Sequence, residues 1–444
     1  MADLALDTFV KRIGDRSASV AVIGLGYVGL PIVLAFHDAG LKVIGFDIDA
    51  AKVEALAEGR SYISHIGAER IAALAGSGRY AGTTDPARLA EADAIIICVP
   101  TPLGPHRDPD LQYVADTARM LAGVLREGQV ISLESTTYPG TCDEVMIPLL
   151  EQSGLKAGAD FDVVYSPERE DPANPSFNTR SIPKVIGAQT REGLQRARAL
   201  YGIIVDEIVE TRDLKTAEAV KITENVFRAV NIALVNELKL IYARMGIDVW
   251  DVIDAAKTKP FGFMPFYPGP GLGGHCIPVD PFYLTWRARA FGMHTRFIEL
   301  SGEINRAMPD HVIAELGLAL SRHRARPYAG SHVLVCGAAY KKNVDDLRES
   351  PALELIEKLE VLGVNVDYWD PLIPEIKPTR AHPGLSGRRS VEMSADYLKS
   401  LDAVLLATDH DATDYDLIAA NAALIVDTRN AFAGRDVAGV LVKA

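Results

Sequence analysis

The segment Ser19-Val-Ala-Val-Ile-Gly-Leu-Gly-Tyr-Val-Gly29 decides the fold, because it joins an apolar run to the spacing Gly-x-Gly-x-x-Gly. Its first part predicts a buried strand over residues 19–24, and the following residues predict a helix over 27–39. In such a turn the first glycine permits the tight bend, the second admits a pyrophosphate and the third lets helix and strand pack closely. The helix N-terminus would then favour the phosphate charge. We therefore expect a dinucleotide site formed by Gly24, Gly26, Tyr27, Val28 and Gly29.

Polar residues at the ends of later strands extend this predicted cofactor site. Asp47 ends the next apolar strand, at residues 42–47. Its carboxylate could accept hydrogen bonds from a ribose and repel a 2′-phosphate, which favours NAD over NADP; the alternative is a solvated turn residue. Lys52 lies either near the ribose or at the surface. Thr101 and Thr136 follow two further strands at their carboxyl ends, where open α/β sheets bind ligands, although either could cap a helix.

Composition narrows the class of protein. A chain of 444 residues with 48% apolar residues predicts two or three globular domains. The sequence has no apolar run long enough for a membrane span, and the alternating first 17 residues predict a short amphipathic helix rather than a secretion signal. A net charge of −13 argues against nonspecific binding to nucleic acid or anionic membranes. We expect a cytoplasmic protein.

Three segments follow one another along the chain. The first alternates strands with helices, which predicts a mostly parallel sheet covered on both faces. Helical periodicity then runs from Leu214 to Ala256, as one long helix followed by a short one around residues 248–257. The α/β pattern starts again at Ser331. Strands are expected at residues 19–24, 42–47, 94–99, 129–134, 161–166 and 184–187, and at 331–337, 364–369, 403–407 and 423–427.

This order predicts two Rossmann-like, doubly wound parallel-sheet domains joined by a long central helix. We place the domains at residues 1–210, 211–325 and 326–444. A single helix of that length in mid-chain ties domains together or forms a subunit interface. We therefore expect a homo-oligomer, at least a dimer through this helix.

The glycine-rich stretch Gly271-Leu-Gly-Gly-His-Cys-Ile-Pro-Val-Asp280 places a cysteine four residues before a carboxylate. A thiolate can attack a carbonyl carbon, and the neighbouring carboxylate can hold a water or take a proton. The ordinary alternative is a structural cysteine in a turn. Beside a nicotinamide, Cys276 with Asp280 suggests oxidation past the aldehyde to a carboxylate. We expect irregular structure over residues 260–281, and no metal, because the sequence has no Cys/His partners at zinc spacing.

Further polar groups stand where helical or strand patterns do not require them. Glu168 and Arg169 follow a predicted strand, and Lys221 and Asn225 lie one turn apart on the long helix. In the last segment, polar residues gather after its first strand: Lys341, Lys342, Asp346, Arg348 and Glu349.

With these motifs, the chain resembles the UDP-glucose/GDP-mannose dehydrogenase family over residues 19–431. The resemblance lies in Glu218-Ala-Val-Lys221 with Asn225, the Gly273-Gly-His-Cys276 loop with Asp280, and Tyr340-Lys-Lys342 with the segment 348–350. The stretches 166–172 and 275–284 look most like the branch that oxidises UDP-N-acetylhexosamines. This implies UDP-N-acetyl-D-glucosamine as the expected substrate, with UDP-N-acetylmannosamine, UDP-N-acetylgalactosamine or UDP-glucose as alternatives.

The resemblance implies a four-electron oxidation of the sugar C6 hydroxyl with two NAD. Asp280, or Lys221 through water, would take the hydroxyl proton, and Cys276 would form a thiohemiacetal and then a thioester. Lys221 and Asn225 would stabilise negative charge on the oxygen, and Glu168 would activate the water that hydrolyses the thioester. Thr136 would help to order that water. Glucose-specific relatives carry a second glutamate where Pro172 stands, so Glu170 or a main-chain group would take its place.

The resemblance also implies contacts to the nucleotide sugar. Lys341 would reach the sugar or phosphate, and Arg348 would reach the cofactor. Three further arginines could contact anions or form only structural ion pairs: Arg169, Arg228 and Arg429. The uridine and phosphate would lie near loop residues, namely Phe266, Tyr267, Gly269 and Gly273.

Two other functions remain open at this point. A two-electron dehydrogenase of 3-hydroxy acids would explain Lys221 and Asn225, but it leaves the Cys276 loop and the third segment without a purpose. A non-catalytic sensor of NAD and a nucleotide sugar would need neither nucleophile nor base.

Overall fold

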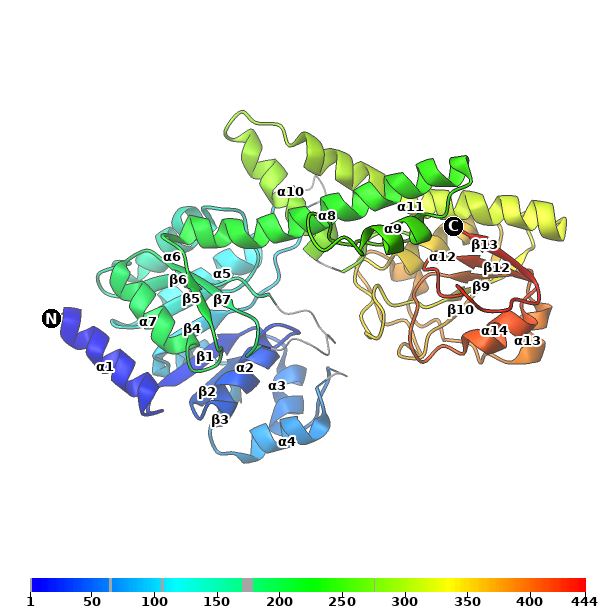
Figure 1. Cartoon of the computed structure of the whole chain (residues 1–444). Coiled ribbons are helices and arrows are strands. Elements are labelled where there is room, and N and C mark those ends of the chain that lie inside the picture. The colour runs from blue at the N-terminus through cyan, green and yellow to red at the C-terminus, as the bar shows by residue number, and fades with distance from the viewer. Residues whose placement is uncertain (1, 64–65, 105–107, 170–178, 275) are drawn as a thin grey trace. The chain divides into compact units, whose positions relative to one another are not determined.

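The computed structural model describes residues 2–63, 66–104, 108–169, 179–274 and 276–444, without the side chains of residues 2–5, 276 and 277 (Figure 1). It divides into two compact units. The first comprises residues 1–224 and 283–293, and the second comprises residues 225–282 and 294–444. The boundary near residue 224 falls inside a single helix, α8 (Leu214–Met245).

The first unit is built on one sheet, whose strand order is β3-β2-β1-β4-β5-β6-β7-β8. Neighbouring strands are parallel except β6 and β7, which pair antiparallel. The mostly parallel sheet predicted from the sequence is confirmed. Its strands are β1 (Ser19–Ile23), β2 (Lys42–Phe46), β3 (Tyr80–Thr83), β4 (Ala94–Ile97), β5 (Val130–Leu133), β6 (Asp162–Tyr165), β7 (Lys184–Ala188) and β8 (Ile208–Glu210).

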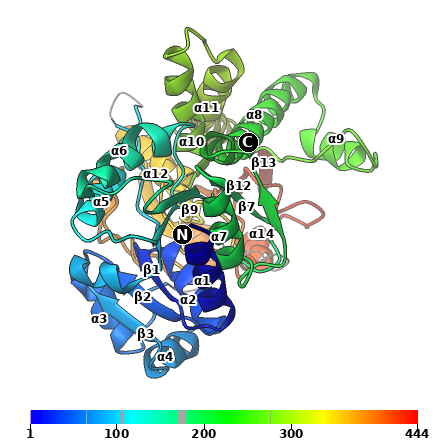
Figure 2. The ribbon, with the colours of Figure 1, turned by 90° about the vertical axis from the view of Figure 1, so that its left-hand side faces the viewer.

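Apolar residues cover both faces of this sheet, and they form two separate core clusters. One cluster contains the buried side of the predicted amphipathic helix, with Phe9 and Ile13 in α1, which packs beside α7 (Figure 2). Besides the start of α8 and the end of the later helix α10 (Cys276–Arg289), the unit contains α1 (Ala2–Gly14), α2 (Gly29–Asp38), α3 (Ala50–Ala57), α4 (Ala68–Gly76), α5 (Gln112–Ala122), α6 (Ile147–Leu150) and α7 (Arg191–Tyr201).

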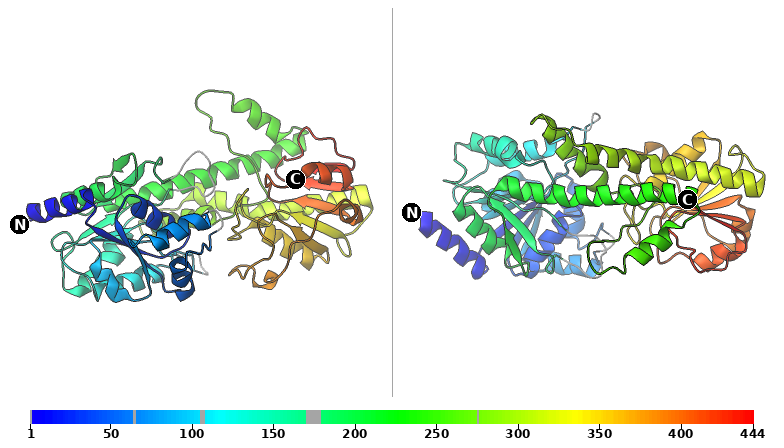
Figure 3. Two further views of the ribbon diagram at one scale, coloured as in Figure 1. Left: turned by 90° about the horizontal axis from the view of Figure 1, so that it is seen from below. Right: turned by 45° about the horizontal axis from the view of Figure 1, so that its top comes forward.

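The predicted central helix is confirmed as α8, which Figure 3 shows as one uninterrupted helix. It ends before Gly246, whose φ of 72° lies in the left-handed region that stops a helix. The short helix α9 (Val249–Ala256) follows, and Asp248 caps it by accepting a hydrogen bond from the Trp250 N–H.

The prediction of irregular structure up to residue 281 is wrong at its end, because residues from Cys276 onward form α10 (Cys276–Arg289). Pro278 lies in the first turn, where N–H groups have no intrahelical partner, so it costs no hydrogen bond. Pro281 removes one bond, but the residues around it are anchored: Asp280 is 1% exposed and Tyr283 is fully buried. Tertiary packing therefore overrides the local preference of proline.

The second unit contains a five-stranded parallel sheet of order β10-β9-β11-β12-β13. Its helices include α11, which a buried hydrogen bond between Asn236 and Asn305 ties to α8. The strands are β9 (His332–Cys336), β10 (Asn365–Trp369), β11 (Ala403–Leu406), β12 (Leu424–Asp427) and β13 (Val440–Lys443). Besides α9 and parts of α8 and α10, the unit contains α11 (Arg296–Ala319), α12 (Pro351–Val361), α13 (Ala395–Ser400) and α14 (Tyr415–Asn421).

Both sheets confirm the predicted fold class of two Rossmann-like domains with a long central helix. The sequence reading missed β3, β8 and β13, which are short edge strands and only partly buried. Within the part of the chain that the structure describes, no helix is both long and apolar enough to cross a membrane.

Candidate active site

The glycine turn after β1 has the shape that a dinucleotide requires. Gly24 has a φ of 92°, and a Cβ there would lie 2.3 Å from the carbonyl oxygen of Cys98. A Cβ on Gly29 would lie 1.8 Å from the carbonyl oxygen of Gly24. Gly26, in contrast, has no atom of the described residues, apart from its chain neighbours, within 4 Å of its Cβ position. The outer glycines thus serve packing, and the middle one leaves the space that a pyrophosphate needs.

Asp47 ties this turn to the end of β2. Its carboxylate accepts hydrogen bonds from the N–H of Leu25 at 2.8 Å, the N–H of Asp49 at 2.9 Å and Nζ of Lys52 at 3.2 Å. It is only 6% exposed, so the alternative of a solvated turn residue is wrong. Lys52 is therefore paired with Asp47 rather than simply a surface residue. Tyr27 and Val28 lie just before α2, which begins two residues later than predicted.

Two threonines follow the neighbouring strands β4 and β5, as predicted. Thr101 is 4% exposed, and its carbonyl oxygen accepts a 2.6 Å hydrogen bond from the hydroxyl of Tyr283. Thr136 is half-buried in the loop after β5. Both residues thus occupy the carboxyl edge of the sheet where a nicotinamide cofactor is expected.

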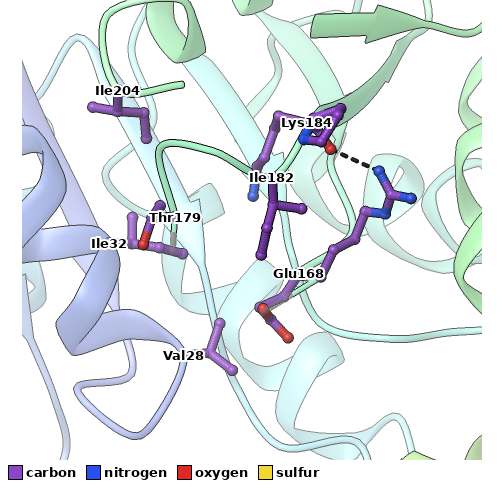
Figure 4. Close-up of a pocket in the computed structure, with 9 residues that line it drawn as sticks. Val28, Ile32, Glu168, Thr179, Ile182, Lys184 and Ile204 are labelled. Atoms are coloured by element: carbon purple, nitrogen blue, oxygen red, sulfur yellow. Dashed lines mark hydrogen bonds between the residues drawn. The ribbon is translucent and has the colours of Figure 1, made fainter. Parts of the chain in front are cut away.

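A pocket in the first unit lies beside the glycine turn (Figure 4). Its lining includes Val28 and, from the segment after β6, Glu168 and Arg169. Nη2 of Arg169 donates a 2.6 Å hydrogen bond to Glu224, and Nη1 donates one of 2.6 Å to the carbonyl of Pro183. Arg169 is therefore held by protein groups, while Glu168 points toward the pocket in Figure 4.

Lys221 on α8 brings a cation to the same unit. Its Nζ lies 3.9 Å from a carboxylate oxygen of Glu168, and their side chains are 8% and 18% exposed. One turn earlier, Glu218 accepts hydrogen bonds from the N–H groups of Gly140 at 2.5 Å and Cys142 at 2.9 Å. Burial raises the pKa of Glu218 to about 7. Glu218 therefore fixes the start of α8 against the loop that carries Thr136.

Sequence reasoning missed a second buried cluster in this unit. Nζ of Lys184, which also lines the pocket, donates a 2.5 Å hydrogen bond to Glu134, and the Tyr201 hydroxyl donates one of 2.7 Å. Ser132 shares a further 2.7 Å hydrogen bond with that hydroxyl. Only the position of Glu134 at the end of β5 could have pointed to it, because its partners lie at least 50 residues away in the chain.

In the second unit, the structure brings together Asn225 and Asp280. The Nδ2 amide of Asn225 donates a 2.6 Å hydrogen bond to Oδ2 of Asp280, and the two residues are 4% and 1% exposed. Cys276 lies one helical turn before Asp280, at the start of α10. Several predicted positions lie outside the described part of the chain: the Cys276 side chain, His275, Glu170 and Pro172.

The other three cysteines, Cys98, Cys142 and Cys336, are free thiols. Burial raises the pKa of Cys98 and Cys142 well above its ordinary value, and it also raises the pKa of Cys336. These three thiols stay protonated at neutral pH, and a thiol attacks carbon poorly. The nucleophilic role of Cys276 stays a prediction.

The loop before α10 packs against the second sheet. A Cβ on Gly269 would lie 2.5 Å from Nη1 of Arg429, and the N–H of Gly269 donates a 3.1 Å hydrogen bond to Asn236. A Cβ on Gly273 would lie 2.6 Å from Cβ of Tyr340. These glycines let the loop approach the carboxyl edge of the sheet closely.

The remaining predicted substrate residues have varied surroundings. Phe266 packs edge-on against Phe227, and Tyr267 stacks on Trp250 at 5.3 Å. Lys341 is partly buried after β9, whereas Arg228 is exposed on α8. Arg348 forms a 2.6 Å ion pair with Asp346. The sequence pointed to both residues but not to their pairing.

Among the described residues, no group of three or more His, Cys, Asp or Glu side chains is arranged to hold a metal ion. The glycine turn and Asp47 instead fit the phosphates and ribose of a dinucleotide.

Comparisons with known proteins match the chain almost from end to end. Three models of the UDP-glucose/GDP-mannose dehydrogenase family match in order: the NAD binding domain at residues 18–205, the central domain at 215–307 and the UDP binding domain at 334–434. A UDP-N-acetyl-D-glucosamine 6-dehydrogenase of Pseudomonas aeruginosa is 38% identical over 81% of this chain and 84% of the relative.

Two further proteins show that the similarity extends beyond one sugar. A UDP-N-acetyl-D-mannosamine dehydrogenase of Salmonella typhi is 34% identical over 88% of this chain and 94% of the relative. The solved structure of a UDP-D-ManNAc dehydrogenase from Pyrococcus horikoshii superposes with a TM-score of 0.84 at 32% identity, covering 96% of this chain and 98% of that one.

An NAD-binding glycine turn in the same chain as a UDP-binding domain defines an NAD-dependent nucleotide-sugar dehydrogenase. The chain belongs to the UDP-glucose/GDP-mannose dehydrogenase family. The match of the UDP binding domain also explains the third segment, which a dehydrogenase of 3-hydroxy acids would leave without a purpose.

Proposed function

We propose that this dehydrogenase oxidises the C6 hydroxyl of a UDP-N-acetylhexosamine to the carboxylate, and that UDP-N-acetyl-D-glucosamine is its substrate. The 38% identity to a dehydrogenase of that sugar supports the choice. The buried pair of Asn225 and Asp280, one turn from Cys276, carries the chemical part of the proposal. A carboxylate and an oriented amide beside a nucleophile are what an aldehyde needs for further oxidation.

The overall reaction consumes one alcohol, two NAD⁺ and one water, and it gives one carboxylate, two NADH and three protons. When bound, NAD accepts the hydride that C6 loses in each oxidation; Gly24, Gly26 and Gly29 would hold its pyrophosphate, and Asp47 its ribose. In the first oxidation, Asp280, or Lys221 through a water, takes the proton of the C6 hydroxyl.

Cys276 then retains the aldehyde. Its Sγ bonds to C6, and the resulting oxyanion accepts hydrogen bonds from the Lys221 ammonium and the Asn225 amide. Asn225 has two N–H groups, and only one is used on Asp280. The second oxidation converts the thiohemiacetal into a thioester.

Hydrolysis completes the cycle. Glu168 takes a proton from water, the water oxygen bonds to C6 and the bond from C6 to Sγ breaks, which restores the thiolate. The Lys221 Nζ lies 3.9 Å from Glu168, so the two side chains can contact the same water.

The test is an assay of NADH formed per nucleotide sugar consumed, with UDP-N-acetylglucosamine, UDP-N-acetylmannosamine, UDP-N-acetylgalactosamine and UDP-glucose. We expect two NADH per sugar, the highest kcat/KM with UDP-N-acetylglucosamine, and no uronate from Cys276→Ser. A ratio of one NADH per sugar would refute the four-electron reaction. A higher kcat/KM with another of the sugars would overturn the assigned substrate only.

We also infer that the enzyme is at least a dimer through α8. Three apolar side chains at seven-residue spacing on this helix are half exposed: Phe227 (49%), Leu234 (49%) and Ile241 (47%). A stripe at this spacing lies along one face of a helix and is typical of helix pairing. Light scattering should give about twice the monomer mass of 48.0 kDa, and Leu234→Glu should lower it. A monomer in the unmutated protein would refute this inference.

A further inference from the structure

The carboxyl ends of three adjacent strands in the second unit are joined by one buried pair, Asp370 and His410. Asp370 follows β10, His410 follows β11, and β9 lies between these two strands. Nε2 of His410 lies 3.1 Å from Oδ2 of Asp370, and both side chains are fully buried. The pair therefore reaches across the end of β9.

The hydrogen bonds of Asp370 show which member of this pair is the donor. Oδ2 also accepts the N–H groups of Ala338 at 2.7 Å and Ala339 at 3.0 Å, directly after β9. Oδ1 accepts the N–H groups of Leu372 at 2.8 Å and Ile373 at 3.1 Å. Burial alone would raise the pKa of Asp370, but its contacts with His410 and the backbone N–H groups bring that pKa below its ordinary value. The carboxylate is thus ionised, and the His410 N–H must donate to it.

The other ring nitrogen of His410, Nδ1, accepts a hydrogen bond from the segment after β9. The backbone N–H of Asn343 donates a 3.0 Å hydrogen bond to Nδ1 of His410. That bond requires an unprotonated Nδ1, which agrees with the proton placed on Nε2. The Asn343 side chain and Asp411 add two reciprocal hydrogen bonds, at 2.6 Å and 3.0 Å. Asn343 has a φ of 60°, so these contacts stabilise an uncommon backbone conformation.

Lys341 lies in residues 340–343, which follow the Asp370 contacts of Ala338 and Ala339 and end at the His410 contact of Asn343. Its first residue, Tyr340, also supports the loop that precedes Cys276. A Cβ on Gly274 would lie 2.8 Å from the Tyr340 ring, and the N–H of Gly274 donates a 2.9 Å hydrogen bond to the carbonyl of Arg348. A shift of residues 340–343 would therefore move Lys341 and disturb the support of the glycine-rich loop.

We propose that His410 is a positioning residue for nucleotide-sugar binding, acting through its Nδ1 contact with the Asn343 N–H to place Lys341. This inference rests on the proposed function, because that proposal assigns Lys341 to the substrate. His410 itself touches no reacting atom. Asp370 orients its ring, and Asn343 transmits the effect.

Two substitutions separate the two ring nitrogens. The amide of asparagine reaches the position of Nδ1, so His410→Asn can still accept the Asn343 N–H. The longer glutamine reaches the position of Nε2, so His410→Gln can still donate to Asp370 but leaves the Asn343 N–H without its acceptor. Both variants delete the ring, so each controls for the packing defect of the other.

The measurement is calorimetric binding of UDP-N-acetylglucosamine without NAD, and of NADH alone, to the full-length wild-type chain and both variants. We expect His410→Gln to weaken nucleotide-sugar binding about tenfold and His410→Asn less than about threefold, as the loss of one hydrogen bond predicts. NADH binding should stay unchanged in both, because the glycine turn and Asp47, which would hold the pyrophosphate and ribose, lie in the other unit. Equal weakening by the two variants, or a parallel loss of NADH binding, would overturn the proposal.

A second measurement needs no substrate, and its first part uses only the wild-type protein, so it tests the contact even if the variants fold poorly. Hydrogen–deuterium exchange over residues 338–346 of the wild-type protein should show a protected amide at Asn343. His410→Gln should exchange faster there than His410→Asn, and rapid exchange in the wild type would refute the contact. Failure of the proposed function looks different: the wild type would bind NADH and none of the four UDP-sugars, while the Asn343 amide stayed protected.

Discussion

The side-chain amide of Asn225 donates a 2.6 Å hydrogen bond to the carboxylate of Asp280, although the two residues are 55 positions apart in the chain. A carboxylate accepts hydrogen bonds only, so the amide nitrogen of Asn225 must face it. Both residues are buried, and this contact therefore fixes the orientation of an amide and an acid one helical turn from Cys276.

Asn225→Asp would replace this hydrogen bond with two buried carboxylates in contact. Their repulsion raises the pKa of the pair in the folded state above its unfolded value, so stability is lost as the pH rises through the carboxyl range. We expect the melting temperature to fall below that of the wild type by more at about pH 8 than at about pH 5, and kcat to fall about 100-fold or more. Asn231→Asp, on the same helix, is the control. Equal losses at both pH values would contradict the assigned contact.

Gly26→Ala should separate cofactor binding from folding. Because no atom of the residues that the structure describes, beyond the chain neighbours, lies within 4 Å of the added Cβ, we expect an unchanged melting temperature. The methyl group would occupy pyrophosphate space, so NADH affinity should fall about tenfold or more in a fluorescence titration.

Gly29→Ala is the counterpart, since its Cβ would lie 1.8 Å from a carbonyl oxygen. It should lower the free energy of unfolding by about 2 kcal/mol or more. If Gly26→Ala destabilised the protein as much, the space assigned to the cofactor would be misplaced.

Glu218 should make stability depend on pH. Its pKa is raised from 4.5 to about 7 by burial, so between these values the unfolded chain binds fewer protons than the folded one. Stability is then lost as the pH rises through this window. Glu218→Gln removes this titration. The difference between its melting temperature and that of the wild type should therefore shift in favour of the variant from about pH 5 to about pH 8. The exposed Glu237→Gln on the same helix should show no such trend. A difference independent of pH would argue against a raised pKa.

Lys239 should make the fold more stable as the pH rises, which is the opposite of the trend expected from Glu218. Burial lowers its pKa from 10.5 to about 8, and its Nζ has no hydrogen-bond partner within the described part of the chain. Below about pH 8 the fold holds a desolvated charge, and this penalty fades as the pH rises toward 10.5. Lys239→Met should therefore raise the melting temperature at neutral pH, and the gain should shrink in alkaline buffer. The exposed Lys399→Met serves as the control, and a loss of stability in Lys239→Met at neutral pH would contradict the prediction.

Much of the fold could be predicted because buried parallel strands have a clear sequence signature. Apolar runs such as residues 94–97 and 403–406 are typical of strands inside a covered sheet, and glycine spacing marks the turn after β1. The edge strands escaped prediction because they are short and partly exposed. α10 escaped it because two prolines mark an irregular segment, and only the burial of Asp280 and Tyr283 shows why a helix persists there.

The partners of the site residues depended on the tertiary structure. Sequence reasoning chose Asp47, Lys221, Asn225 and Asp280, but it could not pair Glu134 with Lys184, or His410 with Asp370. Each of these pairs links two strands that are separated by one other strand in the sheet, and its members are 50 and 40 residues apart in the chain.

By itself, the sequence determined the architecture and the class of chemistry, because apolar periodicity and the residues after strands are local properties of the chain. Only the tertiary structure decided which polar groups meet. The order of strands in each sheet sets which strand ends are adjacent, and burial requires each polar group placed there to find a partner.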